Sequence, residues 1–229
     1  MINILSSNNY KNLKNDIINC RKCPRLVDFR ERIAREKRKS YLDWNYWGKP
    51  IHGFGEINSK LLILGLAPAA HGANRTGRVF TGDKSADFLF KSLYQTHFSN
   101  QRDSVSVDDG LELYAYMTVA VKCVPPGDKP LASEKDNCSG FLSREVKLLS
   151  NLKMVLGLGK IGFESYLRFV KKDYNLKLAD YPFKHGKFYT LPNNIILVGS
   201  YHPSPRNVNT NLLTSDMMNT LLNDIKKEI

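Results

Sequence analysis

The residues with the clearest potential for chemistry lie in a long polar loop between Gly65 and Asp83. The loop follows an apolar run at residues 61–66 that is typical of a buried strand, and it ends where a helical pattern begins near Ser85. It combines Gly, Asn, Arg and Thr with one aromatic residue and one carboxylate. Loops at the carboxyl ends of buried strands are where α/β sheets bind ligands. We interpret this loop as half of a candidate site, although an ordinary strand-to-helix connection is the simpler alternative.

A second polar loop, residues 201–210, follows the last apolar run of the chain. It begins with His202, and Pro203 and Pro205 stiffen the backbone after it. A single histidine is usually a structural residue, but this one is expected at the same edge of the sheet as the first loop. The two loops can therefore face each other across a cleft.

Four cysteines form a second candidate site. Cys20 and Cys23 make a Cys-x-x-Cys motif, and Cys123 and Cys138 lie in the middle of the chain. Paired cysteines in a cytosolic protein indicate metal binding rather than disulfides, and both zinc and a [4Fe–4S] cluster accept four thiolates. Pro24 directly after Cys23 favours the iron–sulfur cluster over zinc. Four unrelated buried cysteines are the structural alternative.

The elements that must position these residues alternate along the chain. Strands are predicted at residues 61–66, 115–121, 154–158 and 195–201. Helices are predicted at residues 8–19, 24–39, 85–98, 133–149, 160–172 and 214–227. This alternation predicts an α/β fold, a three-layer α/β/α sandwich around a mostly parallel four-stranded sheet. The length of 229 residues is compatible with one domain spanning residues 1–229.

The charge of the chain points to a polyanionic partner. Lys and Arg number 34 against 22 Asp and Glu, a formal net charge of +12. This excess favours nucleic acid ahead of a membrane surface, although a merely basic soluble protein has the same composition. No apolar run approaches the roughly 20 residues of a membrane helix, and residues 1–7 lack the basic flank of a signal peptide. We therefore expect a cytoplasmic protein without membrane association, and a monomer.

Together these motifs resemble the uracil-DNA glycosylase superfamily, specifically its family 5, the type B enzymes. The resemblance rests on residues 65–83, on residues 202–210, on the four cysteines and on residues 121–126 around the third of them. It covers nearly the whole domain. It implies a uracil-DNA glycosylase-like fold, a [4Fe–4S] cluster, and hydrolysis of the bond that joins uracil or another deaminated base to deoxyribose in DNA.

The resemblance also implies roles for single residues. The flipped base would stack on Phe80, unless Phe80 is only an aromatic residue of the core, and His202 would donate a hydrogen bond to a carbonyl oxygen of the departing base. Asp83 would stabilise the sugar cation or orient water, unless it only caps the following helix. Related families place an acid or Asn where this chain has Ala69 and Ala70, and that absence fits family 5.

Further site residues follow from the same resemblance. Those expected to bind the substrate are Ala67, Asn74, Arg75 and Val119. Those expected to contact DNA are Arg78, Arg206, Asn207 and Asn209. Several relatives have Asn at the position of Val119. Since valine cannot hydrogen-bond to a base, we expect loose base reading and a substrate range that includes hypoxanthine.

Two other classes of protein share part of this pattern. A metal-containing nucleic-acid-binding protein without catalysis would keep the charge, the cysteines and the loops. An iron–sulfur electron carrier would not need the two polar loops. Within the enzyme class, Lys84 raises the alternative of an amine nucleophile with strand cleavage. The second loop lacks the lysine that this chemistry would need, so a monofunctional hydrolase is expected.

Overall fold

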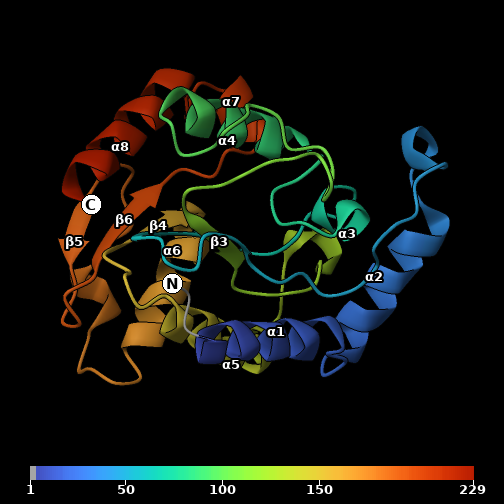
Figure 1. Cartoon of the computed structure of the whole chain (residues 1–229), viewed down its shortest axis with the longest axis horizontal. Helices are drawn as coiled ribbons and strands as arrows, with labels where there is room; N and C mark the ends of the chain where they lie inside the picture. Colours follow the sequence, from blue (N-terminus) through green and yellow to red (C-terminus); the bar gives the residue numbers. More distant parts are fainter. Residues whose placement is uncertain (1–3) are drawn as a thin grey trace.

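The computed structural model describes residues 4–229, so the expectation about a signal peptide at residues 1–7 lies partly outside the described residues. Its centre is a twisted sheet of six strands in the order β1-β3-β2-β4-β6-β5 (Figure 1). The strands are β1 (Phe54–Gly55), β2 (Leu61–Gly65), β3 (Tyr116–Val119), β4 (Met154–Leu158), β5 (Phe188–Thr190) and β6 (Ile196–Ser200).

The four predicted strands form the parallel centre of this sheet. β3, β2, β4 and β6 pair in parallel, whereas β1 and β5 add to the two edges in antiparallel orientation. The prediction of a four-stranded sheet was therefore two strands short. The edge strands have two and three residues and are only partly buried, so they carry no apolar run that periodicity could detect. The central strands are buried on both faces, as parallel sheets require.

Helices and short 3₁₀ turns connect the strands. They are α1 (Ile4–Ile18), α2 (Pro24–Glu36), η1 (Lys39–Tyr41), α3 (Ala73–Thr76), α4 (Lys84–Gln95), η2 (Pro126–Asp128), α5 (Ala132–Leu148), α6 (Gly159–Val170), η3 (Leu178–Asp180), α7 (Pro205–Asn209) and α8 (Ser215–Glu228). All six predicted helices are present within a few residues of their predicted bounds. The two short helices in the polar loops, α3 and α7, were not predicted.

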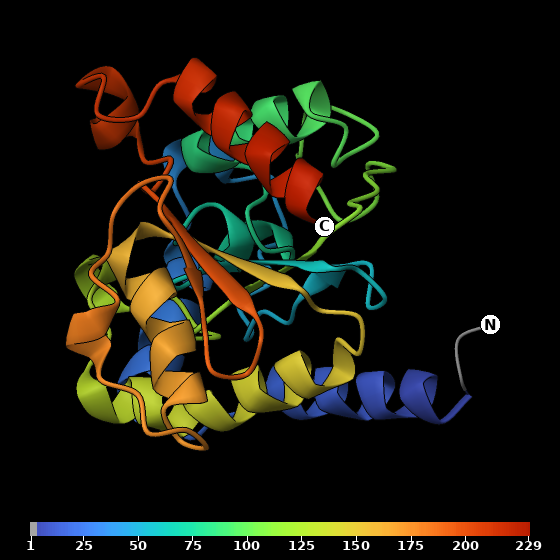
Figure 2. The ribbon, with the colours of Figure 1, turned by 90° about the vertical axis from the view of Figure 1, so that its left-hand side faces the viewer.

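The helices cover both faces of the sheet and make the three predicted layers (Figures 1 and 2). On one face, Ile63 of β2 packs in a cluster with Phe90 of α4 and with α8. On the other, Leu64 packs with Phe163 of α6 and with α5, and α1 lies against α5. Neighbouring residues of β2 pack into clusters on opposite faces of the sheet, because side chains alternate between the two faces along a strand. Among residues 4–229, no helix combines the length and the hydropathy needed to cross a membrane.

Candidate active site and cysteine site

The two polar loops border one cleft at the carboxyl edge of the sheet. The cleft has a volume of about 740 Å³. Its walls include residues 69–72 and 82–85 of the first loop, Pro205 of the second loop, and Asp128 of η2. A cleft of this size at the ends of parallel strands is a common site for a ligand of nucleotide size.

Asp83 lies in the cleft and has two differently used carboxylate oxygens. Oδ1 accepts hydrogen bonds from the backbone amides of Ser85 and Ala86, at 2.9 and 3.0 Å, so Asp83 is the N-cap of α4. Oδ2 faces Gly72 so closely that a Cβ at residue 72 would overlap it. Burial raises the pKa of Asp83, whereas the two amides and the Arg75 charge oppose that rise. Asp83 therefore does cap α4, and it does so through Oδ1 alone, while Oδ2 accepts no hydrogen bond from the described residues.

His202 and Phe80 lie beside each other, outside the lining of the cleft, and Phe80 belongs to the buried core cluster. Their ring centroids are 6.2 Å apart, with the rings tilted by 35°. Phe80 lies over the end of β2, because a Cβ at Gly65 would come within 2.9 Å of its ring and within 3.4 Å of Val119. Burial lowers the pKa of His202 against the opposing effect of Asp128, so its imidazole is neutral at pH 7. The structure thus places Phe80, Val119 and His202 around the ends of β2, β3 and β6.

The second loop orients His202 through its own short helix. Ser204 caps α7 by accepting a hydrogen bond from the backbone amide of Asn207. The side-chain amide of Asn207 donates to the carbonyl oxygen of His202 at 2.9 Å. Arg206 and Asn209 of the same helix are exposed. Of the predicted DNA-contacting residues in this loop, Asn207 is therefore partly used internally, whereas Arg206 and Asn209 are accessible.

Asn74 and Arg78 are buried inside the first loop. The Asn74 side chain donates to the carbonyl oxygen of Arg30, and the Arg78 guanidinium makes a paired contact with Asp109 at 2.7 and 2.9 Å. Arg78 is only 5% exposed. The DNA contact predicted for Arg78 requires a guanidinium at the protein surface, and the structure places it inside.

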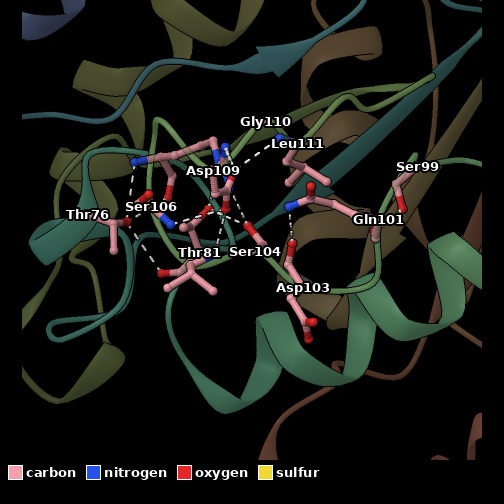
Figure 3. Close-up of polar contacts among 12 residues, drawn as sticks. Thr76, Thr81, Ser99, Gln101, Asp103, Ser104, Ser106, Asp109, Gly110 and Leu111 are labelled. Atoms are coloured by element: carbon pink, nitrogen blue, oxygen red, sulfur yellow. Dashed lines mark hydrogen bonds and ion pairs between the residues drawn. The ribbon is translucent and has the colours of Figure 1, made fainter.

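The loop at residues 99–112 supplies the partner of Arg78. Figure 3 shows Asp109 among polar contacts that also join Thr81 and Ser104, whose hydroxyls are 2.8 Å apart. Burial raises the pKa of Asp109, but the Arg78 guanidinium and three backbone amides outweigh it and hold this pKa at about 2. Although their composition is that of a polar surface loop, residues 99–112 stabilise the first loop, because Ser104 and Asp109 bind its buried side chains.

The four cysteines come together at one cavity. Cys20 and Cys23 reach it from the connection between α1 and α2, Cys123 from the segment after β3, and Cys138 from α5. None of the four forms a disulfide. Ala67, predicted to bind substrate, packs against this cysteine cluster rather than lining the cleft of Asp83.

Two side chains donate hydrogen bonds to the cysteine sulfurs. Nη1 of Arg30 donates to Sγ of Cys123 at 2.9 Å, and Nδ2 of Asn137 donates to Sγ of Cys23 at 3.4 Å. The Arg30 side chain is itself buried, and its Nε has no hydrogen-bond partner in the described part of the chain. Across residues 4–229, no group of three or more His, Cys, Asp or Glu residues is arranged to hold a single metal ion.

Several residues at the cleft had not been assigned from the sequence. Tyr41 and Trp44 line it beside Arg75, and Asp128 lines it near His202. The aromatic content of residues 41–58 was a visible signal, but nothing local in the sequence indicated which segment these rings would contact. Asp128 had no signal beyond its place in a Gly-containing turn.

The fold and the cleft define an α/β protein with a ligand site at the carboxyl ends of its parallel strands, where a carboxylate, a neutral histidine and a buried aromatic ring lie close together. The sequence model described as "Uracil DNA glycosylase superfamily" matches residues 52–226. The chain belongs to this superfamily, and within it to the type-5 group.

The relatives that support this assignment cover most of the chain. A protein named Type-5 uracil-DNA glycosylase from Pyrobaculum aerophilum is 42% identical over 214 residues, which are 93% of this chain and 90% of the relative. Its namesake from Thermus thermophilus is 40% identical over 209 residues, 91% of this chain and 93% of the relative. That from Mycobacterium tuberculosis is 41% identical over 210 residues, 91% and 77% of the two chains. These matches confirm the resemblance to family 5.

Proposed function

We propose that this chain is a DNA-repair glycosylase that removes uracil from DNA and leaves an abasic site. The observation that carries this proposal is the arrangement of Asp83, whose Oδ1 is fixed by two amides while its Oδ2 is free in the cleft. Membership of the type-5 group supports the same activity. The reaction adds water to the sugar carbon as its bond to the base nitrogen breaks, and the base leaves with the bonding electrons.

Asp83 acts on the sugar side of this reaction. Positive charge develops on the sugar as the bond lengthens, and a carboxylate held in place stabilises that charge or orients the attacking water. The two hydrogen bonds from α4 fix the carboxylate before substrate arrives, which limits reorganisation during the reaction. Ala69 and Ala70 line the cleft near Asp83 and supply no competing acid.

His202 acts on the base side. Negative charge develops on a carbonyl oxygen of the leaving base, and a neutral imidazole can donate a hydrogen bond to it. Burial keeps the imidazole neutral, and Asn207 holds the backbone of the loop. Phe80 provides an aromatic face for a base that has left the helical stack.

Replacing His202 with alanine is expected to lower the rate of base release by about 100-fold, the effect typical of removing one such donor. The affinity for DNA should stay close to that of the wild type, because the donor acts mainly as charge develops. Single-turnover kinetics and a binding isotherm measure the two quantities. His97→Asn, at an exposed histidine outside the cleft, is the control. An unchanged rate would remove His202 from the mechanism.

Base selectivity depends on the side chains that would contact the flipped base, Val119 among them. Val119 is buried next to the Phe80 ring and offers no hydrogen bond to a base. We propose that shape and stacking dominate base recognition and that hypoxanthine is a second substrate.

Single-turnover base release from matched duplexes carrying uracil or hypoxanthine tests the function and the selectivity together. Alkali treatment then reveals the abasic sites. Release of uracil supports the glycosylase, and comparable rates for both bases support the loose pocket. A strong preference for uracil would contradict the loose pocket alone. No release of either base, with DNA binding preserved, would favour a non-catalytic nucleic-acid-binding protein.

Electrostatic attraction between basic residues and the DNA phosphates brings DNA to the cleft. The exposed Arg206 and the exposed basic residues of positions 21–39, such as Arg32 and Arg35, supply phosphate contacts whose strength falls as salt rises, whereas Arg30 of that range is buried. We further propose that residues 1–229 form one domain and that the protein acts as a monomer in the cytoplasm. Lys84 is exposed and pairs with Asp87, so we propose hydrolysis without an amine nucleophile.

We infer that the four cysteines hold a [4Fe–4S] cluster. The shared cavity and the donors from Arg30 and Asn137 support it, because such donors stabilise the thiolates and sulfides of a cluster. The cluster would join the connection between α1 and α2 to the sheet and to α5, so its contribution is structural. Zinc bound to the same thiolates is the alternative.

Replacing Cys138 with serine is expected to remove the metal and most of the soluble folded protein. One of four ligands is lost, and metal binding is coupled to folding. Iron, sulfide and zinc analysis, visible absorbance and thermal melting report the result. Ser139→Ala on the same helix is the matched control and should keep its iron. Zinc without iron in the wild type would overturn the cluster assignment.

A further inference from the structure

The Arg75 side chain connects the two ends of the loop that carries Asp83. Its Nε donates to the carbonyl oxygen of His71, and its Nη2 donates to the carbonyl oxygen of Gly82, both at 2.7 Å. Gly82 directly precedes Asp83, and His71 directly precedes Gly72, which faces Asp83 Oδ2. The guanidinium therefore sets the spacing of the backbone on both sides of this carboxylate.

Two aromatic rings hold the guanidinium from a different part of the chain. The guanidinium carbon of Arg75 lies 4.0 Å from the ring centroids of both Tyr41 and Trp44. These rings belong to the connection between α2 and β1, and both line the cleft. In the same connection, the Tyr46 hydroxyl is 3.0 Å from Nδ1 of His71, the residue whose carbonyl oxygen Arg75 binds.

Hydrogen bonds alone do not explain the position of Arg75. Its side chain is 3% exposed, and its Nη1 is buried without a partner in the described part of the chain. A buried unpaired donor costs free energy, so the guanidinium is held where it is by its two carbonyl partners and by the two rings.

We propose that Tyr41 and Trp44 form an aromatic clamp that positions Asp83 for hydrolysis by holding Arg75. The clamp residues and Arg75 are positioning residues, since they act through the loop and not on the substrate. This proposal rests on the proposed glycosylase function and adds a segment of the chain that the active site did not otherwise include.

The clamp also affects the charge on Asp83. Burial raises the pKa of Asp83, and the positive charge of Arg75 counteracts part of that rise. The charged and titratable groups that line the cleft around Asp83 are Arg38, Tyr41, His71, Arg75, Lys84, Asp87 and Asp128. Loosening Arg75 removes one of the cations nearest to the carboxylate, so the carboxylate becomes easier to protonate.

Trp44→Leu and Tyr41→Leu test the clamp in the full-length protein. Each is expected to lower the single-turnover rate of uracil release about 10- to 100-fold, because a small displacement of a catalytic group is costly. The acid limb of the pH–rate profile should move to higher pH. Affinity for DNA that carries a non-cleavable 2′-fluorinated deoxyuridine should not change. Trp44→Phe keeps a ring over Arg75 and should restore both the rate and the profile.

A matched control exists at another arginine of the same loop, Arg78, which contacts an aromatic ring of β1. The ring centroid of Phe54 lies 4.9 Å from the guanidinium carbon of Arg78. Phe54→Leu therefore removes a ring from a buried arginine that binds Asp109 and not the residue next to Asp83. Thermal melting should show that all these variants fold. A wild-type rate and profile in Trp44→Leu would overturn the clamp. So would a loss confined to DNA affinity, or an equal profile shift in Phe54→Leu. Absence of uracil release from the wild type would instead overturn the proposed function, and the same assay shows it before any variant is compared.

Discussion

Replacing Asp83 with asparagine is expected to lower the rate of uracil release by about 10²- to 10⁴-fold while the protein stays folded. Asparagine is as good an N-cap as aspartate, so its carbonyl oxygen can still accept the hydrogen bonds from Ser85 and Ala86. What the substitution removes is the negative charge at Oδ2. Single-turnover kinetics and thermal melting on the same preparation measure the two effects separately.

The pH dependence gives this prediction a second readout. In the proposed mechanism the active form of Asp83 is the carboxylate. Because burial raises its pKa, the wild-type rate should fall with acid at a higher pH than an exposed aspartate would give. Asp83→Asn should lack this acid limb. Asp173→Asn, at an exposed carboxylate outside the cleft, should keep both the rate and the limb. A rate for Asp83→Asn close to that of the wild type would exclude the carboxylate from catalysis.

Replacing Lys122 with methionine is expected to destabilise the protein by about 3–5 kcal/mol. Lys122 and Glu145 are each 1% exposed, and their charged groups form an ion pair at 2.5 Å. Glu145 also accepts hydrogen bonds from Thr118 and from the backbone amide of Gly53. Without the lysine, these neutral donors remain, but a carboxylate is left deep in the interior without a cation. The change should appear as a lower midpoint of urea unfolding.

Two comparison variants separate the buried pair from a general charge effect. Adding Glu145→Leu to Lys122→Met removes the unpaired carboxylate and should recover part of the stability. Lys84→Met breaks an exposed pair with Asp87 and should change the free energy of unfolding by no more than about 0.5 kcal/mol. An unchanged midpoint for Lys122→Met would show that the pair contributes nothing. Because Lys122 also donates to the carbonyl oxygen of Val119, the pair joins the end of β3 to α5.

Local patterns in the sequence were sufficient for the centre of the fold. Apolar runs such as residues 61–66 can be satisfied only by burial in a covered sheet, and amphipathic runs can cover it, so the alternating order predicted the α/β layers. Parallel strands end at one edge, so the loops after β2 and β6 were expected together, and both border the observed cleft. The edge strands β1 and β5 were not predicted, because short, partly buried strands leave no hydrophobic pattern in the sequence.

The uses of individual polar residues were decided by tertiary structure. Arg75, Arg78 and Arg206 have the same side-chain chemistry, yet the first two are buried and Arg206 is exposed. Their partners come from distant segments, the rings of residues 41–44 for Arg75 and Asp109 for Arg78. The sequence by itself therefore determined the layers of the fold, the family and the set of groups available for chemistry. Which of those groups face the cleft and which hold it in shape depends on burial and on long-range packing, and these exist only in the folded chain.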